Sequence, residues 1–185
     1  MKYAPIDPAL FILNRKNFIK ELKPKSIALF NANDEFPRSG DQSYIFKQNA
    51  DLFYLSGIDQ EQSILLLFPD CPNPLYKEVL FLRQTSELIA VWEGHKYTMD
   101  EALKASGIQS VYWLHDFWNI LPGIIHYSER IYLNTNENDR YAHQVPYRDQ
   151  RFIEEIRNRY PLHQYERSAL ILRDLRPLKS ITEVE

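Results

Sequence analysis

The chain has 185 residues, of which 44% are hydrophobic, 25% charged and 14% aromatic. This length supports one domain with its own core, and the composition excludes a wholly disordered or collagen-like chain. The net charge of −3 lacks the basic excess that a phosphate backbone requires, so we expect no nucleic-acid partner.

The single cysteine and the short apolar runs indicate where the protein works. Cys71 cannot form an intramolecular disulfide, which favours a reducing compartment and, by default, the cytoplasm. The carboxylate of Asp70 beside it would raise the thiol pKa, so we expect Cys71 to be inert. The apolar runs at 9–13 and 64–68 fall far short of the ~20 residues of a membrane span, so no membrane partner is expected.

The first predicted elements are a helix over 8–22 and a buried strand over 26–30. Asp7 and Pro8 form a typical helix start, since Asp accepts orphan N–H groups and Pro has none to leave unpaired. Lys23 and Pro24 end the helix, and a loop is expected at 31–34. One helical face carries the apolar residues Phe11, Ile12, Phe18, Ile19 and Leu22.

The middle of the chain is predicted as three strands. Residues 52–57 are aromatic-rich and end at a glycine, which favours a strand over a helix. Residues 64–68 are apolar at every position, and 77–82 form another strand after a turn at 70–74. A strand that is apolar throughout is usually covered on both faces, which predicts an α/β fold with helices on each side of the sheet.

Helices and strands alternate in the second half of the chain. The capping-box pattern of Thr98 and Glu101 begins a helix that stops at Gly107. Strands are predicted at 111–114 and 131–133, with a helix at 116–120 between them. A further helix begins at Pro146 and ends at Pro161, and its apolar stripe consists of Phe152, Ile153, Ile156 and Tyr160.

The last residues contain a second capping box, formed by Ser180 and Glu183. The sequence stops at Glu185, before one turn of that helix is complete. A helix this short is not stable by itself. We therefore expect that a further domain begins here in a longer parent protein; a frayed natural terminus is the alternative.

Few residues match the patterns of known catalytic or metal sites. The five histidines are scattered, without an H-x-x-x-H or H-E-x-x-H pair. Asp139 and His143 are four residues apart, but their Asn- and Pro-rich surroundings favour a solvated loop over a metal site. A G-x-S-x-G elbow is absent, and 5 glycines are too few for a phosphate-binding glycine loop.

Two segments remain as candidates for function. Arg38 and Asp41 flank a Ser-Gly pair and either present charge outward or form a turn in which Asp41 accepts backbone N–H groups and Arg38 pairs locally. Trp92 precedes Glu93 and Gly94, and it is either a core residue or an exposed aromatic anchor of the kind found at interfaces.

These segments resemble the N-terminal domain of Xaa-Pro aminopeptidases (aminopeptidase P). Residues 38–58, RSGDQSYIFKQNADLFYLSGI, resemble the family's R-x-x-D…Y-x-[FY]-[RK]-Q-[NS]-[SA]-D block. Residues 92–94, with 100–102 and 107–108, are similar to its W-x-G segment and the following helix. Residues 175–184 are similar to the R-x-x-K-[SD]-x-x-E-[IV] signature that joins this domain to the catalytic one.

The resemblance implies a fold, a domain organisation and a catalytic site in a second domain. The fold would be α/β, with a mixed β-sheet of about six strands flanked by helices, as in creatinase and prolidase. Residues 1–174 would form the N-terminal domain, and 175–185 a linker and the first turn of a pita-bread catalytic domain. In the family that second domain holds two divalent ions, usually manganese, through Asp, Asp, His, Glu and Glu. None of those positions lies in this chain, so the resemblance implies no catalytic residue, metal ligand or cofactor here.

The resemblance also implies partners and site residues. In oligomeric members the N-terminal domain of one subunit borders the active site of another. Trp92 and Asp41 occupy the positions suggested for that contact, and Arg38 is a third candidate, more a structural partner of its loop. The expected partners are the chain's own C-terminal catalytic domain, further copies in a dimer or tetramer, and proline-containing peptides. A prolidase- or creatinase-like parent and a non-enzymatic binding module of the same fold are the alternatives.

Overall fold

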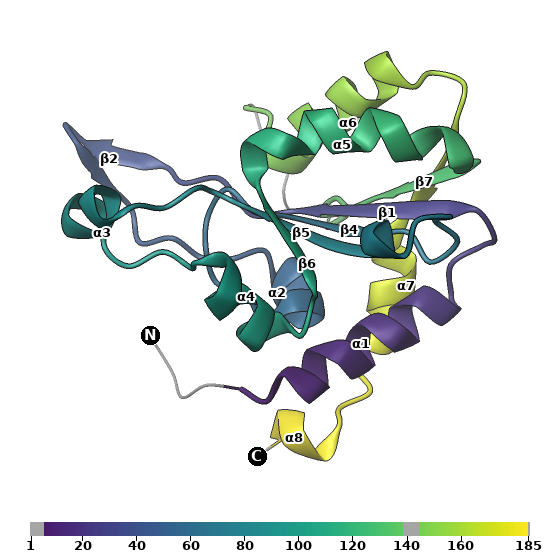
Figure 1. Cartoon of the computed structure of the whole chain (residues 1–185), viewed down its shortest axis with the longest axis horizontal. Coiled ribbons are helices and arrows are strands. Elements are labelled where there is room, and N and C mark those ends of the chain that lie inside the picture. Colours follow the sequence, from purple (N-terminus) through teal and green to yellow (C-terminus); the bar gives the residue numbers. More distant parts are fainter. Residues whose placement is uncertain (1–5, 139–144, 185) are drawn as a thin grey trace.

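A six-stranded sheet forms the middle layer of the computed structural model, which describes residues 6–138 and 145–184 (Figure 1). The strand order is β6-β5-β4-β1-β7-β8. Within this sheet β4 runs antiparallel to β1 and β5, whereas the pairs β1–β7, β7–β8 and β5–β6 are parallel. The strands are β1 (Ser26–Asn31), β4 (Ile64–Leu67), β5 (Glu78–Leu82), β6 (Ser110–Trp113), β7 (Arg130–Leu133) and β8 (Gln164–Arg167). The predicted mixed sheet of about six strands is thus confirmed.

Helices cover both faces of this sheet, as the apolar strands predicted (Figure 1). On one face lie α1 (Pro8–Lys20), α2 (Ala50–Ser56), α4 (Met99–Ser106) and α7 (Ser168–Leu175). On the other lie α5 (Phe117–Ile124) and α6 (Arg148–Arg159). Successive β1 residues face opposite layers: Ile27 and Leu29 pack towards α5 and α6, and Ala28 and Phe30 towards the other helices. Each face therefore has its own apolar core.

The local helix signals of the sequence are confirmed. Asp7 Oδ1 accepts the N–H of Ala9 at 2.8 Å at the start of α1. Thr98 and Glu101 form the expected capping box of α4, and Gly107 ends that helix with φ +72°. In α6 the expected apolar stripe faces the core, with Phe152 and Ile156 fully buried.

The prediction of a strand over 52–57 is wrong, because these residues form helix α2. Asn49 caps the helix by accepting the N–H groups of Asp51 and Leu52 at 2.9 and 3.3 Å. Gly57 ends it with φ +69°, and a Cβ there would lie 2.3 Å from the Phe11 ring. The buried positions Leu52, Leu55 and Ser56 have helical spacing, which outweighs the β propensity of the aromatic residues between them.

Several elements were not predicted. The edge strand β8 and helix α7 follow α6, and the short helix α3 (Glu87–Glu93) follows β5. The segment around Arg38 is a two-stranded hairpin of β2 (Pro37–Ser39) and β3 (Gln42–Ser43), with Gly40 at φ +58° in its turn. Helix α8 (Ile181–Val184) begins where the second capping box predicted a helix, whereas the 3-10 turns at Pro74–Tyr76, Leu114–Asp116 and Ile125–Tyr127 were not predicted. Within the described residues no helix is long and apolar enough to cross a membrane.

A buried arginine joins the helices on the α1 face. The Arg15 side chain is 1% exposed, and its Nη1 donates to the carbonyl oxygens of Leu55 and Ser106 at 2.8 and 3.0 Å. These carbonyls lie at the C-terminal ends of α2 and α4, where backbone acceptors lack helical partners. Arg15 Nε also donates to Glu78 Oε2 at 2.9 Å. One side chain thus ties three helices to strand β5.

One edge of the sheet gathers the features that the sequence singled out. The carboxyl ends of β1, β5, β6, β7 and β8 all lie at this edge, because β4 alone among the six is reversed. The β2–β3 hairpin follows β1 and α3 follows β5, and in Figure 1 both project from the same end of the molecule. Crevices at the carboxyl ends of strands are the usual ligand sites of α/β sheets.

Candidate functional site

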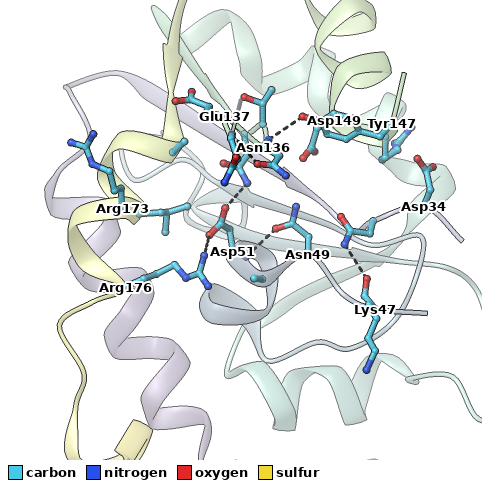
Figure 2. A pocket seen from close by; sticks show the side chains of 18 of the residues that line it. Asp34, Lys47, Asn49, Asp51, Asn136, Glu137, Tyr147, Asp149, Arg173 and Arg176 are labelled. Atoms are coloured by element: carbon cyan, nitrogen blue, oxygen red, sulfur yellow. Dashed lines mark hydrogen bonds and ion pairs between the residues drawn. The ribbon is translucent and has the colours of Figure 1, made fainter. Parts of the chain in front are cut away.

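A cleft of about 1230 Å³ opens at this edge, between the hairpin, α2, α7 and the start of α6. Figure 2 shows polar side chains that converge there from α2, the start of α6, α7 and the loop after β7. Its lining includes the hairpin residues Phe36, Tyr44 and Ile45 and, on the opposite side, Arg176, Pro177 and Lys179. The cleft therefore reaches from the hairpin to the segment that follows α7.

Asp51 is the centre of a hydrogen-bonded network in this cleft (Figure 2). Its Oδ1 accepts from Arg176 Nη1 at 2.8 Å, and its Oδ2 accepts from Asn134 Nδ2 at 2.9 Å. Asn134 comes directly after β7 and is 4% exposed, and its own Oδ1 has no hydrogen-bond partner among the described residues. The network joins α2, β7 and the segment after α7, and it leaves one buried acceptor inside the cleft lining.

Asp149, in the first turn of α6, is the most perturbed acid of the cleft. Its side chain is 4% exposed, and its Oδ1 accepts from Asn31 Nδ2 at 3.2 Å. Burial raises the pKa of the Asp149 carboxyl from 3.8 to about 7; the hydrogen bond from Asn31 and the charge of Arg148 offset part of that rise. Near neutral pH this group can both donate and accept a proton.

The segment between the hairpin and α2 is mainly structural. Gln48 Nε2 donates to the carbonyls of Ile58 and Gln60 at 3.0 and 2.8 Å, which links the segment before α2 to the segment after it. Asn49 caps the helix, and Asp51 forms the network above. The block places polar groups at the cleft without a nucleophile of its own.

Arg38 and Asp41 lie together on the exposed hairpin. Both side chains are exposed, and neither has a hydrogen bond or ion pair with a described residue. The alternative in which Asp41 accepts backbone N–H groups and Arg38 pairs locally is therefore not what the structure contains. Of the two possibilities drawn from the sequence, outward presentation of charge fits the hairpin.

Trp92 lies on α3 and is 81% exposed, so it is not a core residue of this chain. Leu88 and Val91 precede it by four residues and one residue, and both are exposed as well. Positions four and three apart lie on the same side of a helix, so Leu88, Val91 and Trp92 form one apolar face. The structure does not bring Trp92 into the cleft lining, which includes hairpin residues but none from α3.

The remaining candidates that the structure describes do not form a chemical site. In the ranges 6–138 and 145–184, no group of three or more His, Cys, Asp and Glu side chains is placed to hold a metal ion. Asp139 and His143 lie outside the described residues. Cys71 is buried, and burial raises the pKa of its thiol, which keeps it a weak nucleophile.

The cleft residues Asn134 and Asp149, and Asn31 that binds Asp149, were missed at the level of sequence. A usable signal was present for two of them, because Asn31 and Asn134 directly end or follow apolar strands that turn out to be parallel neighbours. Polar residues at the carboxyl ends of neighbouring parallel strands meet at one sheet edge. The sequence alone did not reveal which strands are neighbours.

Comparison with known proteins identifies a family and a fold. The family model described as "Aminopeptidase P, N-terminal domain" matches residues 11–132. A Xaa-Pro aminopeptidase from Haemophilus influenzae is 26% identical over 111 residues, which cover 60% of this chain and 25% of that protein. The chain thus spans about a quarter of the length of this curated relative.

Solved structures share the fold at lower identity. An aminopeptidase P structure from Bacillus anthracis superposes with a TM-score of 0.85 at 24% identity, and the match covers 97% of this chain and 42% of that one. A zinc-substituted Escherichia coli aminopeptidase P in complex with product gives a TM-score of 0.75 at 21% identity, with 98% and 41% covered. In both, the match leaves more than half of the solved chain uncovered.

Proposed function

The chain belongs to the aminopeptidase P N-terminal domain family, and from this premise we propose that it is the non-catalytic N-terminal domain of a metal-dependent Xaa-Pro aminopeptidase. The parent enzyme would remove the N-terminal residue that precedes proline. The domain would support oligomerisation and border the active site of a neighbouring subunit.

The observation that carries this proposal is the exposed apolar surface at the carboxyl edge of the sheet. Helix α3 buries none of its residues fully and turns Leu88, Val91 and Trp92 outward. The hairpin beyond β1 exposes Phe36, Tyr44 and Ile45. Exposed apolar groups of this extent usually mark a surface that another protein covers. A catalytic domain or a second subunit is the partner that the family suggests.

The three candidate residues have different roles in this proposal. Trp92 would form an apolar wall near the peptide and contribute stacking and contact area. Asp41 would supply hydrogen-bond acceptors, since its carboxylate is exposed and has no ion pair with a described residue. Arg38 is the weaker third candidate, and its free guanidinium could pair with a carboxylate of the partner.

The hydrolytic chemistry would belong to the C-terminal catalytic domain. That domain would hold the pair of divalent ions, with manganese as the expected metal, and bound ions of this kind would supply an activated water and a polarised carbonyl there. The described residues offer no cluster of ligands for such ions, so this metal pair does not fit the chain. Residues 175–185 would form the linker to that domain. A cytoplasmic location is part of the proposal and is supported by the single, buried Cys71.

The proposal is tested by Trp92→Ala in the full-length parent enzyme. We expect KM for longer Xaa-Pro peptides to rise while kcat changes less, because a side chain beyond the reacting bond contributes mainly to binding. Trp118→Phe is a matched control, since Trp118 lies in α5 and packs against Phe117 and Phe152 on the other face of the sheet. Unchanged kinetics together with an unchanged oligomer would remove the assigned role. Activity only on dipeptides would favour a prolidase-like parent, and binding without hydrolysis would favour a non-enzymatic module.

A further inference from the structure

Helix α3 has little apolar contact with the rest of the chain: Ile89 and Ala90 are half-buried, and its larger apolar face is exposed. It has seven residues, none of them fully buried, and its apolar face points to solvent. Short helices in proteins are normally stabilised by packing an apolar face on the core. Two half-buried apolar residues give a seven-residue helix little packing, so the segments on either side of α3 are needed to set the position of Trp92.

Polar tethers surround the C-terminal end of α3. Glu61, in the loop before β4, is 5% exposed and lies 2.5 Å from Lys96 Nζ and 3.3 Å from Arg83 Nη1. Arg83 follows β5 and also binds both carboxylate oxygens of Glu93, at 2.6 and 2.8 Å. Glu93 directly follows Trp92. A single buried carboxylate thus connects the cations on both sides of the tryptophan.

The path of the backbone allows both tethers to form. Gly94 has φ +81°, a conformation that side-chain-bearing residues rarely adopt, and it turns the chain after α3. Lys96 then reaches Glu61, and the N–H of Tyr97 donates to Gln60 Oε1 at 2.6 Å. The W-x-G pattern at 92–94 therefore has a physical reason: the glycine returns the chain to the sheet edge.

Because Glu61 is buried, these ion pairs favour one arrangement of α3. Glu61, Arg83, Glu93 and Lys96 form a network with two negative and two positive charges. Removing a buried carboxylate from water is costly unless its partners are in place, so arrangements of α3 that separate Lys96 or Arg83 from Glu61 are disfavoured. The hydrogen bond with Glu93 raises the pKa of Arg83, as expected for a tightly bound pair.

We propose that Glu61 is a positioning residue for Trp92: its buried carboxylate, bound to Arg83 and Lys96, fixes the helix that presents the tryptophan. The functional meaning rests on the role proposed above for Trp92. The structural claim, that α3 depends on Glu61 for its order, is independent of that role.

The test measures backbone and indole ¹⁵N relaxation in the 185-residue chain. We expect Glu61→Gln to lower the order parameters of residues 88–96 from about 0.85 towards about 0.6, while the Trp113 and Trp118 indoles remain unchanged. Glu129→Gln is the matched control, because Glu129 also pairs with a lysine and an arginine, Lys25 and Arg130, but lies at the amino end of β7. Unchanged order parameters at 88–96 would overturn the proposal.

Further variants keep the test decisive if Glu61→Gln does not fold. Lys96→Met removes one cation from Glu61, and the surface change Glu93→Gln weakens the link between α3 and Arg83. Both are expected to lower the order of residues 88–96, whereas Lys96→Arg keeps the charge and should preserve it. If neither Lys96→Met nor Glu93→Gln has an effect, the proposal is wrong.

A kinetic arm in the parent separates this inference from the proposed function. Glu61→Gln and Trp92→Ala should each raise KM. The double variant should raise KM by less than the sum of the two effects in free energy, since both changes act through Trp92. If Trp92→Ala changes nothing while the relaxation result stands, the proposed function fails and the positioning role remains. If Trp92→Ala raises KM but Glu61→Gln changes neither the relaxation nor KM, the positioning role fails and the proposed function remains.

Discussion

Arg176 Nη1 lies 2.8 Å from Asp51 Oδ1, so two motifs that are 125 residues apart in the sequence meet in the cleft. Asp51 belongs to the block between the hairpin and α2, and Arg176 begins the R-x-x-K segment after α7. Asn134 Nδ2 binds the second oxygen of the same carboxylate. The segment after α7 is thereby attached to the sheet edge that carries the candidate surface.

This contact predicts an order of mutational effects. Asp51→Ala should lower the free energy of unfolding by about 1–3 kcal/mol, because it leaves the buried Asn134 amide without its acceptor. Arg176→Ala should cost less, roughly 0–1 kcal/mol, since the Arg176 side chain is 42% exposed and its ion pair is screened by solvent. Urea unfolding of both variants measures the difference. A larger loss for Arg176→Ala would contradict this assignment.

The buried Arg15 predicts a larger effect. Arg15→Met removes the donors to the ends of α2 and α4 and leaves Glu78 without its cation, so the unfolding free energy should fall by about 3–5 kcal/mol. Lys16→Met, at the exposed neighbouring position, should stay within about 0.5 kcal/mol of the wild type. Thermal and urea unfolding compare the two. Equal stabilities would show that the Arg15 contacts do not support the fold.

Alanine substitutions at two glycines distinguish the cost of backbone strain from the cost of steric contact. Gly57 and Gly40 both have positive φ, but a Cβ at Gly57 would lie 2.3 Å from the Phe11 ring, whereas a Cβ at Gly40 meets nothing within 4 Å. Gly40→Ala should cost about 1 kcal/mol from conformation alone, and Gly57→Ala about 1–3 kcal/mol more from the forced repacking of Phe11. Urea unfolding measures both losses. Equal losses of unfolding free energy in the two variants would contradict this prediction.

These results show which parts of the fold follow from local sequence. The starts of α1 and α4 were predictable because Asp7, Thr98 and Glu101 act on backbone groups within three residues. Helix α2 was not, because its cap, Asn49, lies just outside the aromatic run that suggested a strand. Strand β8 was missed because it is a polar edge strand, half-exposed to fully exposed at every position.

The candidate site was predictable only in part, for a topological reason. Arg38, Asp41 and Trp92 stand in recognisable motifs, and exposure of all three is visible only in the structure. The cleft residues Asn134 and Asp149, and Asn31 that binds Asp149, belong to the ends or starts of elements far apart in the chain. Their proximity arises from the parallel pairing of β1 with β7 and from the packing of α6, neither of which is encoded locally.

Asp149 predicts a pH dependence of stability with a defined sign. Its pKa is about 7 in the folded chain and 3.8 as the ordinary value, so between these values the folded state binds more protons than the unfolded state. The contribution of Asp149 to stability is therefore present at low pH and is lost as the pH rises towards 7. The shift corresponds to roughly 4 kcal/mol as an upper bound.

The variant Asp149→Asn isolates this contribution, because the amide does not titrate. The unfolding free energy of Asp149→Asn minus that of the wild type should be larger at pH 8 than at pH 5. Urea unfolding of both proteins at both pH values measures this difference. Asp174→Asn, at an exposed carboxylate, is the control for the same change of side chain at the surface. A wild-type minus Asp149→Asn difference that is flat with pH would mean that Asp149 ionises normally.

The central claim, that this domain belongs to a Xaa-Pro aminopeptidase and leaves the chemistry to another domain, is tested most directly by peptide hydrolysis. The measurement is release of the first residue from an Xaa-Pro peptide, with manganese present, by the 185-residue chain and by the full-length parent. The account predicts release by the parent and none by the chain. Manganese-dependent release by the purified chain, or a parent that binds such peptides without cleaving them, would contradict it.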